Sequence, residues 1–205
     1  MNNKNSEIQD NGHDSLTISS MPQILEEIRN DDSFLAPKSH NILIYDSIKS
    51  FVKFYCEYAA KWLPRNEIVL VGTQYQTFDT VEIALGKVGI DVGRHVDEGT
   101  LKIIDDQQGY LAGDNYGVIK LATTRVHRAR KKGRHGVSGI VDMGAFIGFQ
   151  KDDELISYEL SLPQEYEEGM LRSVCCYHDG DFARLLPQQK KTLLDHHSKT
   201  ILAQE

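Results

Sequence analysis

The sequence predicts an α/β fold of three layers, with helices on both faces of a mostly parallel central sheet. Short, continuous apolar runs alternate along the chain with longer amphipathic segments, which is the pattern of strands buried on both faces and separated by helices. The connecting segments are long enough to hold a helix, as a parallel crossover requires. A chain of 205 residues is also long enough for one domain with a substantial core.

The strands are predicted from the apolar runs, each of which ends at a glycine or at polar residues. The run Ile42–Ile44 forms the centre of the first strand, and the run Ile68–Val71 forms the centre of the second. The predicted strands cover residues 41–45, 67–72, 101–105, 136–141 and 172–177, and residues 199–203 are expected as a last strand at the edge of the sheet.

The helices are predicted from apolar side chains at helical spacing and from the residues that stop them. In residues 47–63 this spacing runs from Ile48 to Ala59, and Pro64 ends the helix. Gly89 and Gly99 end the next two helices. The predicted helices cover residues 47–63, 77–87, 92–98, 115–132, a segment within 152–166 that is interrupted at Pro163, and 181–196 with a disturbance at Pro187.

Three segments are expected along the chain. Residues 1–19 are rich in Asn, Ser and Asp without apolar periodicity, so they are predicted to be a disordered tail. Residues 20–37 are predicted to form a short N-terminal helix and a linker, because Ser20 and Gln23 match a capping box. Residues 38–205 are predicted to form the main domain.

Composition narrows the class of protein. The net charge of −7 does not favour general binding to nucleic acids. No apolar run approaches the roughly 18 residues of a membrane span, and the N-terminus has no apolar signal core. We therefore expect a soluble, cytoplasmic protein without a membrane interaction. Cys56, Cys175 and Cys176 contain no C-x-x-C pair, so they are expected as buried thiols.

Polar residues follow each predicted strand. In open parallel sheets, ligands bind in the crevice beyond the carboxyl ends of the strands. The sequence therefore predicts a ligand site at that edge. The polar or flanking residues that follow the strands are Tyr45, Asp46, Thr73, Gln74, Asp105, Asp106, Asp142, Met143, Tyr177, His178 and Asp179.

The segment from His40 to Ser50 is a buried strand, a turn and an amphipathic helix, which is where α/β nucleotide-binding proteins carry a phosphate loop. The glycines of that loop, whose N–H groups bind phosphates, are missing here. Lys49 and Ser50 stand where the Lys-Ser end of the motif would fall. This segment favours a binding or sensing domain without a cofactor, and a residual nucleotide hydrolase that uses Asp142 is the alternative.

Two further motifs have competing interpretations. Asp195-His196-His197 spells the tripeptide of the DHH phosphoesterases, and a metal phosphoesterase using Asp142, His178 and Asp179 is an alternative. We expect no metal, because histidines at the end of a helix also suit the negative end of its dipole. Glu159 lies on a predicted helix and is either a partly buried carboxylate with a shifted pKa or a surface residue.

A basic run lies at the end of the helix predicted for residues 115–132. Such a run is favourable next to the negative end of a helix dipole, and the alternative is a contact surface for nucleic acid or an acidic protein partner. Base-specific recognition is not supported, because the run has no interleaved aromatic residues and no reader motif, so a protein partner is favoured over direct binding to nucleic acid. The candidate partner-binding residues are Arg125, Arg128, Arg130, Lys131 and Lys132.

An ordered set of residues resembles the MEDS domain, the sensory domain named after methanogens, methylotrophs and the regulator DcmR. The set comprises His40, Tyr45, the segment 99–105, Tyr110, Tyr158-Glu159, Cys176-Tyr177 and His197, and the resemblance covers about residues 38 to 203. It implies a RecA/KaiC-like core that has lost its phosphate loop and senses small molecules such as hydrocarbon derivatives, often beside DNA-binding or kinase modules. It nominates His40, Tyr45, Glu159, Tyr177 and His197 as the shared polar residues.

Two departures from the family pattern concern the ligand. Asp142 falls where relatives often carry Glu, and Phe146 and Phe149 follow it where a Trp is usual. We expect a non-catalytic sensory domain that binds a small molecule and signals to a separate regulator of the transcription or two-component type, or acts through self-association. A ligand-free interaction scaffold is the third hypothesis. The predicted ligand-binding residues are His40, Tyr45, Asp46, Asp142, Glu159, Tyr177 and His197.

Overall fold

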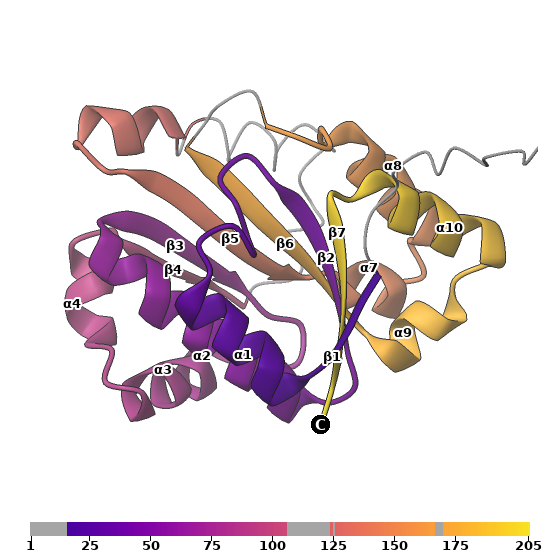
Figure 1. Ribbon diagram of the computed structural model, residues 1–205, viewed down its shortest axis with the longest axis horizontal. Coiled ribbons are helices and arrows are strands. Elements are labelled where there is room, and N and C mark those ends of the chain that lie inside the picture. The colour runs from indigo at the N-terminus through magenta and orange to yellow at the C-terminus, as the bar shows by residue number, and fades with distance from the viewer. Residues whose placement is uncertain (1–15, 106–123, 125, 167–169) are drawn as a thin grey trace, which may run out of the picture.

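The computed structural model describes residues 16–105, 124, 126–166 and 170–205. Within these residues, seven parallel strands form one sheet in the order β1-β7-β2-β6-β5-β3-β4 (Figure 1). The prediction of a three-layer α/β fold with a parallel sheet is confirmed. The strands are β1 (Leu16–Ser20), β2 (His40–Tyr45), β3 (Glu67–Gly72), β4 (Leu101–Ile104), β5 (Gly136–Asp142), β6 (Leu171–His178) and β7 (Lys199–Gln204).

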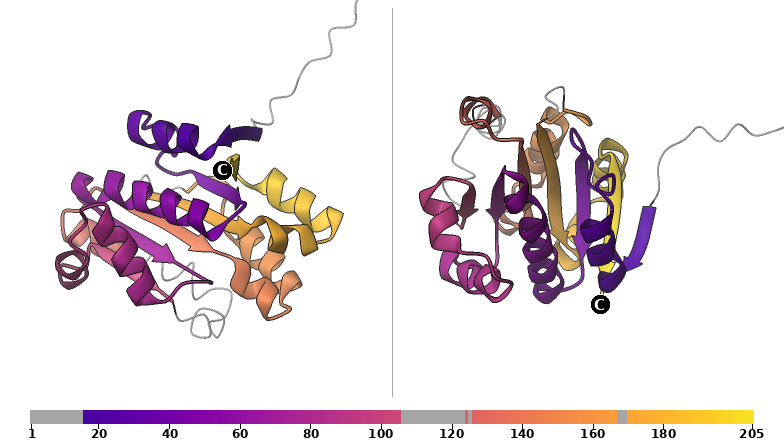
Figure 2. Two further views of the ribbon diagram at one scale, coloured as in Figure 1. Left: turned by 90° about the horizontal axis from the view of Figure 1, so that it is seen from below. Right: turned by 60° about the vertical axis from the view of Figure 1, so that its left-hand side comes forward.

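Helices cover both faces of the sheet (Figures 1 and 2). Connections that move along the sheet in opposite directions place their helices on opposite faces, because parallel crossovers are right-handed. One face carries α1 (Met21–Asn30), α2 (Ile48–Trp62) with the 3₁₀ turn η1 (Leu63–Arg65), α3 (Phe78–Lys87) and α4 (Val92–Asp97). The other carries α7 (Gly144–Gly148), α8 (Asp152–Ser161), α9 (Asp179–Arg184) and α10 (Pro187–His196).

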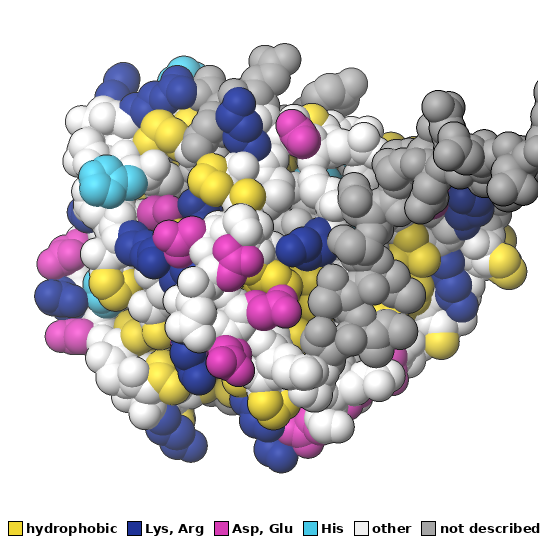
Figure 3. All heavy atoms as spheres, in the orientation of Figure 1, with side chains coloured by type: hydrophobic (Ala, Val, Ile, Leu, Met, Phe, Trp, Pro, Cys, Tyr) yellow, Lys and Arg dark blue, Asp and Glu magenta, His cyan; other side chains and the backbone are white. Residues whose placement is uncertain are grey.

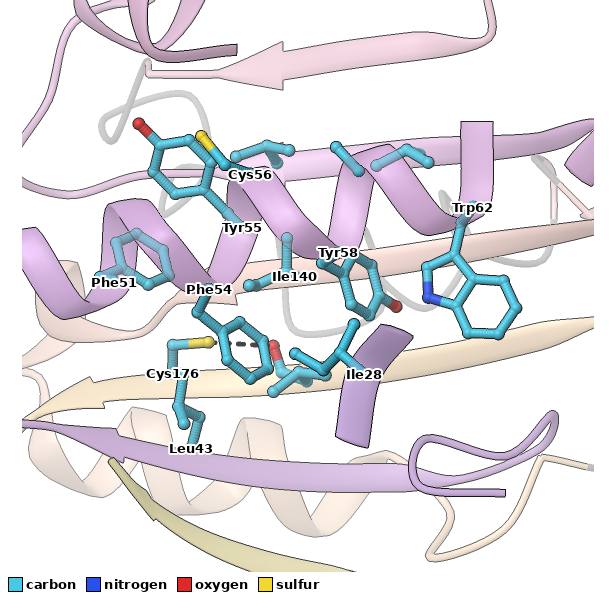
Figure 4. Close-up of a cluster of buried hydrophobic side chains, with 14 of the residues drawn as sticks. Ile28, Leu43, Phe51, Phe54, Tyr55, Cys56, Tyr58, Trp62, Ile140 and Cys176 are labelled. Carbon is cyan, nitrogen blue, oxygen red and sulfur yellow. Dashed lines mark hydrogen bonds between the residues drawn. The ribbon is translucent and has the colours of Figure 1, made fainter. Parts of the chain in front are cut away.

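The larger core lies between α1, α2 and the sheet. Figure 4 shows the side chains of α2 on the sheet beside Ile28 of α1 and Leu43 of β2. Four aromatic residues of α2 are buried in this core: Phe51, Phe54, Tyr55 and Tyr58. A smaller cluster on the other face packs α7, α8 and α10 against the alternate residues of β2 and β6. Successive residues of a strand point to opposite faces, so Cys176 contacts the larger core and Cys175 the smaller one.

The N-terminal helix begins as predicted. The Gln23 side chain accepts hydrogen bonds from the Ser20 N–H at 3.1 Å and from its hydroxyl at 2.9 Å. The assignment of residues 16–19 to the tail is wrong, because they belong to β1, which pairs with β7. The pairing of β1 with β7 joins segments that are far apart in the sequence, so a local pattern does not predict it. Residues 1–15 lie outside the described residues.

Two other predictions change. The strand β7 is not at the edge, because β1 pairs with it on its outer side. The five-residue helix α7 was not predicted, since its glycines and small residues give no helical periodicity. Of the helix predicted for residues 115–132, the described residues 124 and 126–131 are helical. Val126 and Ala129 of this segment are buried against Ile68 and Val137.

Candidate functional site

Three described strands end in polar side chains at one edge of the sheet. Tyr45 is the last residue of β2, Asp142 of β5 and His178 of β6, and Tyr45 is aligned with His178 in the β2–β6 pairing. The chain leaves β2 towards α2 on one face, whereas it leaves β5 and β6 towards α7 and α9 on the other. This divergence is the topological switch point at which parallel sheets bind ligands.

Asp142 is the buried centre of this edge. Its Oδ2 accepts a hydrogen bond of 2.5 Å from the Tyr45 hydroxyl, and its Oδ1 accepts one of 2.8 Å from the Gly144 N–H. Burial raises the pKa of Asp142 to about 6, although both hydrogen bonds favour the ionised form. Burial and the Asp142 charge raise the pKa of Tyr45 far above its ordinary value. Tyr45 is therefore a neutral donor to a carboxylate that titrates near neutral pH.

A second tyrosine–carboxylate pair lies beside the first. Tyr75, which follows β3, donates its hydroxyl hydrogen to Asp181 of α9. Tyr75 is 47% exposed, so this pair faces water. A methyl group on Gly144 would lie 2.9 Å from Asp181 Oδ2, 3.0 Å from Asp142 Oδ1 and 3.1 Å from the Tyr75 hydroxyl oxygen. The two pairs therefore converge at Gly144, where only hydrogen can occupy the Cβ position without displacing them.

Asp46 follows β2 but belongs to a different set of contacts. Its carboxylate accepts hydrogen bonds from the Ser50 hydroxyl at 2.6 Å and from the Glu205 N–H at 2.8 Å. Lys49 is an exposed partner of Glu205, at 3.1 Å. The residues at the position of a phosphate loop thus hold the start of α2 and the last residue of the chain together.

Four of the predicted ligand-binding residues form a separate, buried cluster. His40 is the first residue of β2, so it lies at the opposite end of that strand from Tyr45. Tyr177 of β6 and Glu159 of α8 lie on the face covered by α8 and α10, and His197 directly follows α10. Tyr177 is aligned with Ile44 in the β2–β6 pairing, so this cluster extends along β2 on the face of the sheet opposite to the one that Tyr45 contacts. Glu159 is fully buried, so the interpretation of it as a surface residue is wrong.

Glu159 is the centre of this buried cluster. Its Oε1 accepts a hydrogen bond of 2.5 Å from the Tyr177 hydroxyl. Its Oε2 lies 3.3 Å from His40 Nε2 and 3.5 Å from His197 Nε2. The Sγ atom of Cys175 lies 3.3 Å from His40 Nε2, whereas the sequence predicts this residue only as a buried thiol outside any site. The alternation of Cys175 and Tyr177 along β6 was the available signal.

The electrostatic balance keeps this carboxylate ionised. Burial opposes the charge of Glu159, but His197 and His40 in their protonated forms outweigh burial through their hydrogen bonds and charges and hold its pKa well below the usual range. Burial lowers the pKa of His40. Burial, together with the nearby Glu159 charge, raises the pKa of Cys175 and of Tyr177 well above their ordinary values. One ligand atom from each of four residues lies within 4.8 Å of the other three, which is close enough to hold a metal ion: His40, Glu159, Cys175 and His197.

The tripeptide Asp195-His196-His197 does not act as one unit. Asp195 pairs with Lys191 at 2.5 Å on the surface. His196 contacts the Leu162 carbonyl oxygen at 2.7 Å through its Nε2. The His196 ring packs edge-on to His40 at 5.8 Å between ring centroids, whereas His197 points its Nε2 at Glu159. The arrangement therefore does not assemble the metal site that the tripeptide would indicate in a phosphoesterase.

The described part of the basic run lies on the helical residues 126–131 and on Lys132, which follows them. Arg128, Arg130, Lys131 and Lys132 are exposed, and Arg125 lies outside the described residues. Figure 3 shows Lys and Arg side chains at the top left, over the salmon helix of Figure 1. Arg130 Nε lies 3.3 Å from Met170 Sδ. This surface is separate from both polar clusters.

The fold and the site together define a parallel α/β domain whose sequence lacks the glycines of a phosphate loop. At the position of that loop, the side chain of Asp46 forms hydrogen bonds within the protein. The family model of MEDS, the methanogen/methylotroph DcmR sensory domain, matches residues 39–198. The match covers most of the chain, so the chain belongs to the MEDS family, and the expected resemblance is confirmed. A comparison with curated proteins finds no match. Among the described residues, no helix combines the length and the apolar character that a membrane crossing requires.

Proposed function

We propose that this chain is a sensory domain that binds a small polar molecule at the carboxyl edge of the sheet, next to Tyr45 and Asp142, and signals to a separate regulator. The sensory role follows from membership of the MEDS family. The observation that carries the choice of site is the meeting of two tyrosine–carboxylate pairs at Gly144. In each pair, the tyrosine follows or ends a strand whose next helix covers one face of the sheet. The carboxylate belongs to an element on, or leading to, the other face.

The chemistry of the edge favours one class of ligand. Asp142 and Asp181 are close enough that the charge of Asp181 contributes to the raised pKa of Asp142. A second anion would add repulsion, whereas a hydroxyl or amine group can donate to these carboxylates. The tyrosine hydroxyls would then be released to donate to an oxygen of the ligand. The proposed ligand is therefore a small alcohol or amine, uncharged or cationic.

The same contacts suggest how binding would be transmitted. Tyr75 follows β3 and is connected to α3 on one face, while Asp181 belongs to α9 on the other. A ligand that replaces this hydrogen bond breaks the link between the segment that holds Tyr75 and the helix α9. The populations of the linked and unlinked conformations then shift, and a partner protein can distinguish them at the surface. Lys49 and Ser50 are held by Glu205 and Asp46, which supports recognition without phosphate transfer. The exposed basic residues Arg128, Lys131 and Lys132 are the proposed surface for an acidic partner.

Calorimetric titration with a panel of small alcohols, amines and carboxylates tests the site. We expect saturable binding of an alcohol or amine, and a loss of about tenfold or more in affinity for Tyr45→Phe and Asp142→Asn. Tyr58→Phe is the matched control, because Tyr58 is buried against α2's side of the sheet and its hydroxyl contacts the Gly139 oxygen only at 3.5 Å. The absence of saturable binding, or equal losses in all three variants, contradicts the proposal.

A further inference from the structure

Two buried acceptor atoms face each other in the cluster around Glu159. His197 Nδ1 lies 2.7 Å from the Leu193 carbonyl oxygen, so this nitrogen carries the hydrogen and donates it. In the neutral ring, Nε2 then has a lone pair and points at Glu159 Oε2, 3.5 Å away. Neither atom has a hydrogen-bond partner among the described residues. Buried acceptors without a partner are costly, and a positive species between them removes that cost.

The spacing of the surrounding atoms matches a coordination shell. Tetrahedral zinc has bonds of about 2.0–2.1 Å to nitrogen and oxygen and about 2.3 Å to sulfur, which gives edges of about 3.3–3.6 Å between ligand atoms. Three edges here are 3.3 Å from His40 Nε2 to Glu159 Oε2, 3.3 Å from His40 Nε2 to Cys175 Sγ, and 3.5 Å from His197 Nε2 to Glu159 Oε2. The remaining edges are no longer than 4.8 Å and would contract on binding.

We propose that His40 Nε2, Glu159 Oε2, Cys175 Sγ and His197 Nε2 bind a divalent transition metal of the zinc class. Two imidazoles, a thiolate and a carboxylate select zinc or cobalt over calcium or magnesium, which take oxygen ligands. All four side chains are buried and come from separate parts of the fold: β2, α8, β6 and the junction of α10 with β7. Four protein ligands leave no open position, so the metal links these elements and does not activate water.

The outer contacts of His197 and Glu159 fit this role, whereas His40 Nδ1 has no hydrogen-bond partner among the described residues. Metal-binding histidines usually donate their second N–H to a carbonyl or carboxylate, and ligating carboxylates are themselves hydrogen-bonded. His197 donates to Leu193, and Glu159 accepts from Tyr177. Binding forms one metal–sulfur bond and releases one proton from the Cys175 thiol to solvent, and it displaces to solvent any proton held between the histidine Nε2 atoms and Glu159.

Metal content and cobalt spectroscopy of a chain without a polyhistidine tag test this proposal. We expect one zinc ion per chain, and we expect apoprotein loaded with Co²⁺ to show the sulfur-to-cobalt charge-transfer band of a thiolate ligand. Cys175→Ser and His197→Gln should abolish both signals. Cys176→Ser is the matched control, since the neighbouring thiol is equally buried but faces the opposite side of the sheet.

The competing arrangement is a proton shared between His197 and Glu159. It predicts no stoichiometric metal, no charge-transfer band and the same behaviour for Cys175→Ser and Cys176→Ser, and any of these results overturns the proposal. If Cys175→Ser does not fold, competition for zinc between wild-type apoprotein and a chromophoric chelator decides the question. The proposal is independent of the ligand site at Tyr45, because Tyr45→Phe should lose ligand affinity and keep its zinc.

Discussion

The two polar clusters share a central contact but differ in the charges around it. In each, a tyrosine hydroxyl donates a 2.5 Å hydrogen bond to a buried carboxylate, from Tyr45 to Asp142 and from Tyr177 to Glu159. The pKa of Asp142 is raised to about 6 by burial, with Asp181 nearby. The pKa of Glu159 is lowered, because the contacts with His197 and His40 outweigh burial. The carboxylate of the pair at the edge of the sheet, Asp142, is therefore near its titration point. The carboxylate of the pair beneath α8, Glu159, stays ionised.

Removal of each carboxylate should give the largest difference between the clusters. Glu159→Ala leaves two buried histidines without their anion, and we expect the free energy of unfolding to fall by about 3–5 kcal/mol. Asp142→Ala should cost less, about 1–3 kcal/mol, because that carboxylate is already poorly stabilised in its charged form. Urea unfolding at neutral pH measures both values. A greater loss for Asp142→Ala would reverse the assignment of the two clusters.

The second-largest difference between the clusters is expected in how the free energy of unfolding depends on pH. The folded pKa of Asp142 exceeds its ordinary value of 3.8, so the folded state binds more protons between the two values. Stability from this group is present at low pH and falls by up to about 3 kcal/mol as pH rises towards 6. Glu159 has the opposite sign, since its stabilisation is present above its ordinary pKa and is lost as pH falls through the lowered folded pKa.

Unfolding of wild type and Asp142→Asn between pH 4.5 and 7.5 measures this effect. The substitution removes the titrating carboxyl, so the variant should lack the decline in stability that wild type shows as pH rises. Lys49→Ala, at an exposed residue, is a control that should keep the wild-type profile. Identical profiles for wild type and Asp142→Asn would show that Asp142 has an ordinary pKa in the folded protein.

The sequence was sufficient to predict most of the strands and helices, but it predicted less of the arrangement of the two polar clusters. Strands such as β2 and β3 are continuous apolar runs because both faces are buried, so their pattern is local and readable. The cluster around Glu159 depends instead on the register that places Ile42 opposite Cys175 and on the packing of α8 over β6. Such pairings join distant parts of the chain, and no local pattern encodes them.

At the carboxyl edge of the sheet, the sequence predicted which residues lie there but not which contacts they make. The rule for parallel sheets placed Tyr45 and Asp142 at one edge correctly, since both end their strands. It could not show that Asp46 turns towards Ser50 and Glu205. It also gave no reason to single out Tyr75, because its contact with Asp181 joins segments that are 106 residues apart.

Loss of each tyrosine hydroxyl should give a smaller effect than removal of Glu159, and its pH dependence sharpens the comparison. At pH 7.5 we expect Tyr45→Phe and Tyr177→Phe each to cost about 1.5–3 kcal/mol, the usual value for a hydrogen bond to a charged group. At pH 5 Asp142 is largely protonated, so the cost of Tyr45→Phe should fall to about 1 kcal/mol. The cost of Tyr177→Phe should not change, because Glu159 remains ionised. Parallel changes in both variants would contradict the difference in pKa.

The smallest chemical change is the addition of one methyl group at the edge. Gly144→Ala places Cβ about 3 Å from three polar oxygen atoms, so it should cost about 1–3 kcal/mol as overpacking does and should weaken binding at the Tyr45 site. Gly86 of α3 is the matched control, since a methyl group there meets nothing within 4 Å. Gly86→Ala should stabilise the protein by about 0.5–1 kcal/mol through helix propensity. Thermal unfolding and the calorimetric titration measure both substitutions. If Gly144→Ala is as stable as wild type and binds equally well, the two tyrosine–carboxylate pairs do not meet at this glycine, and the edge is not a single site.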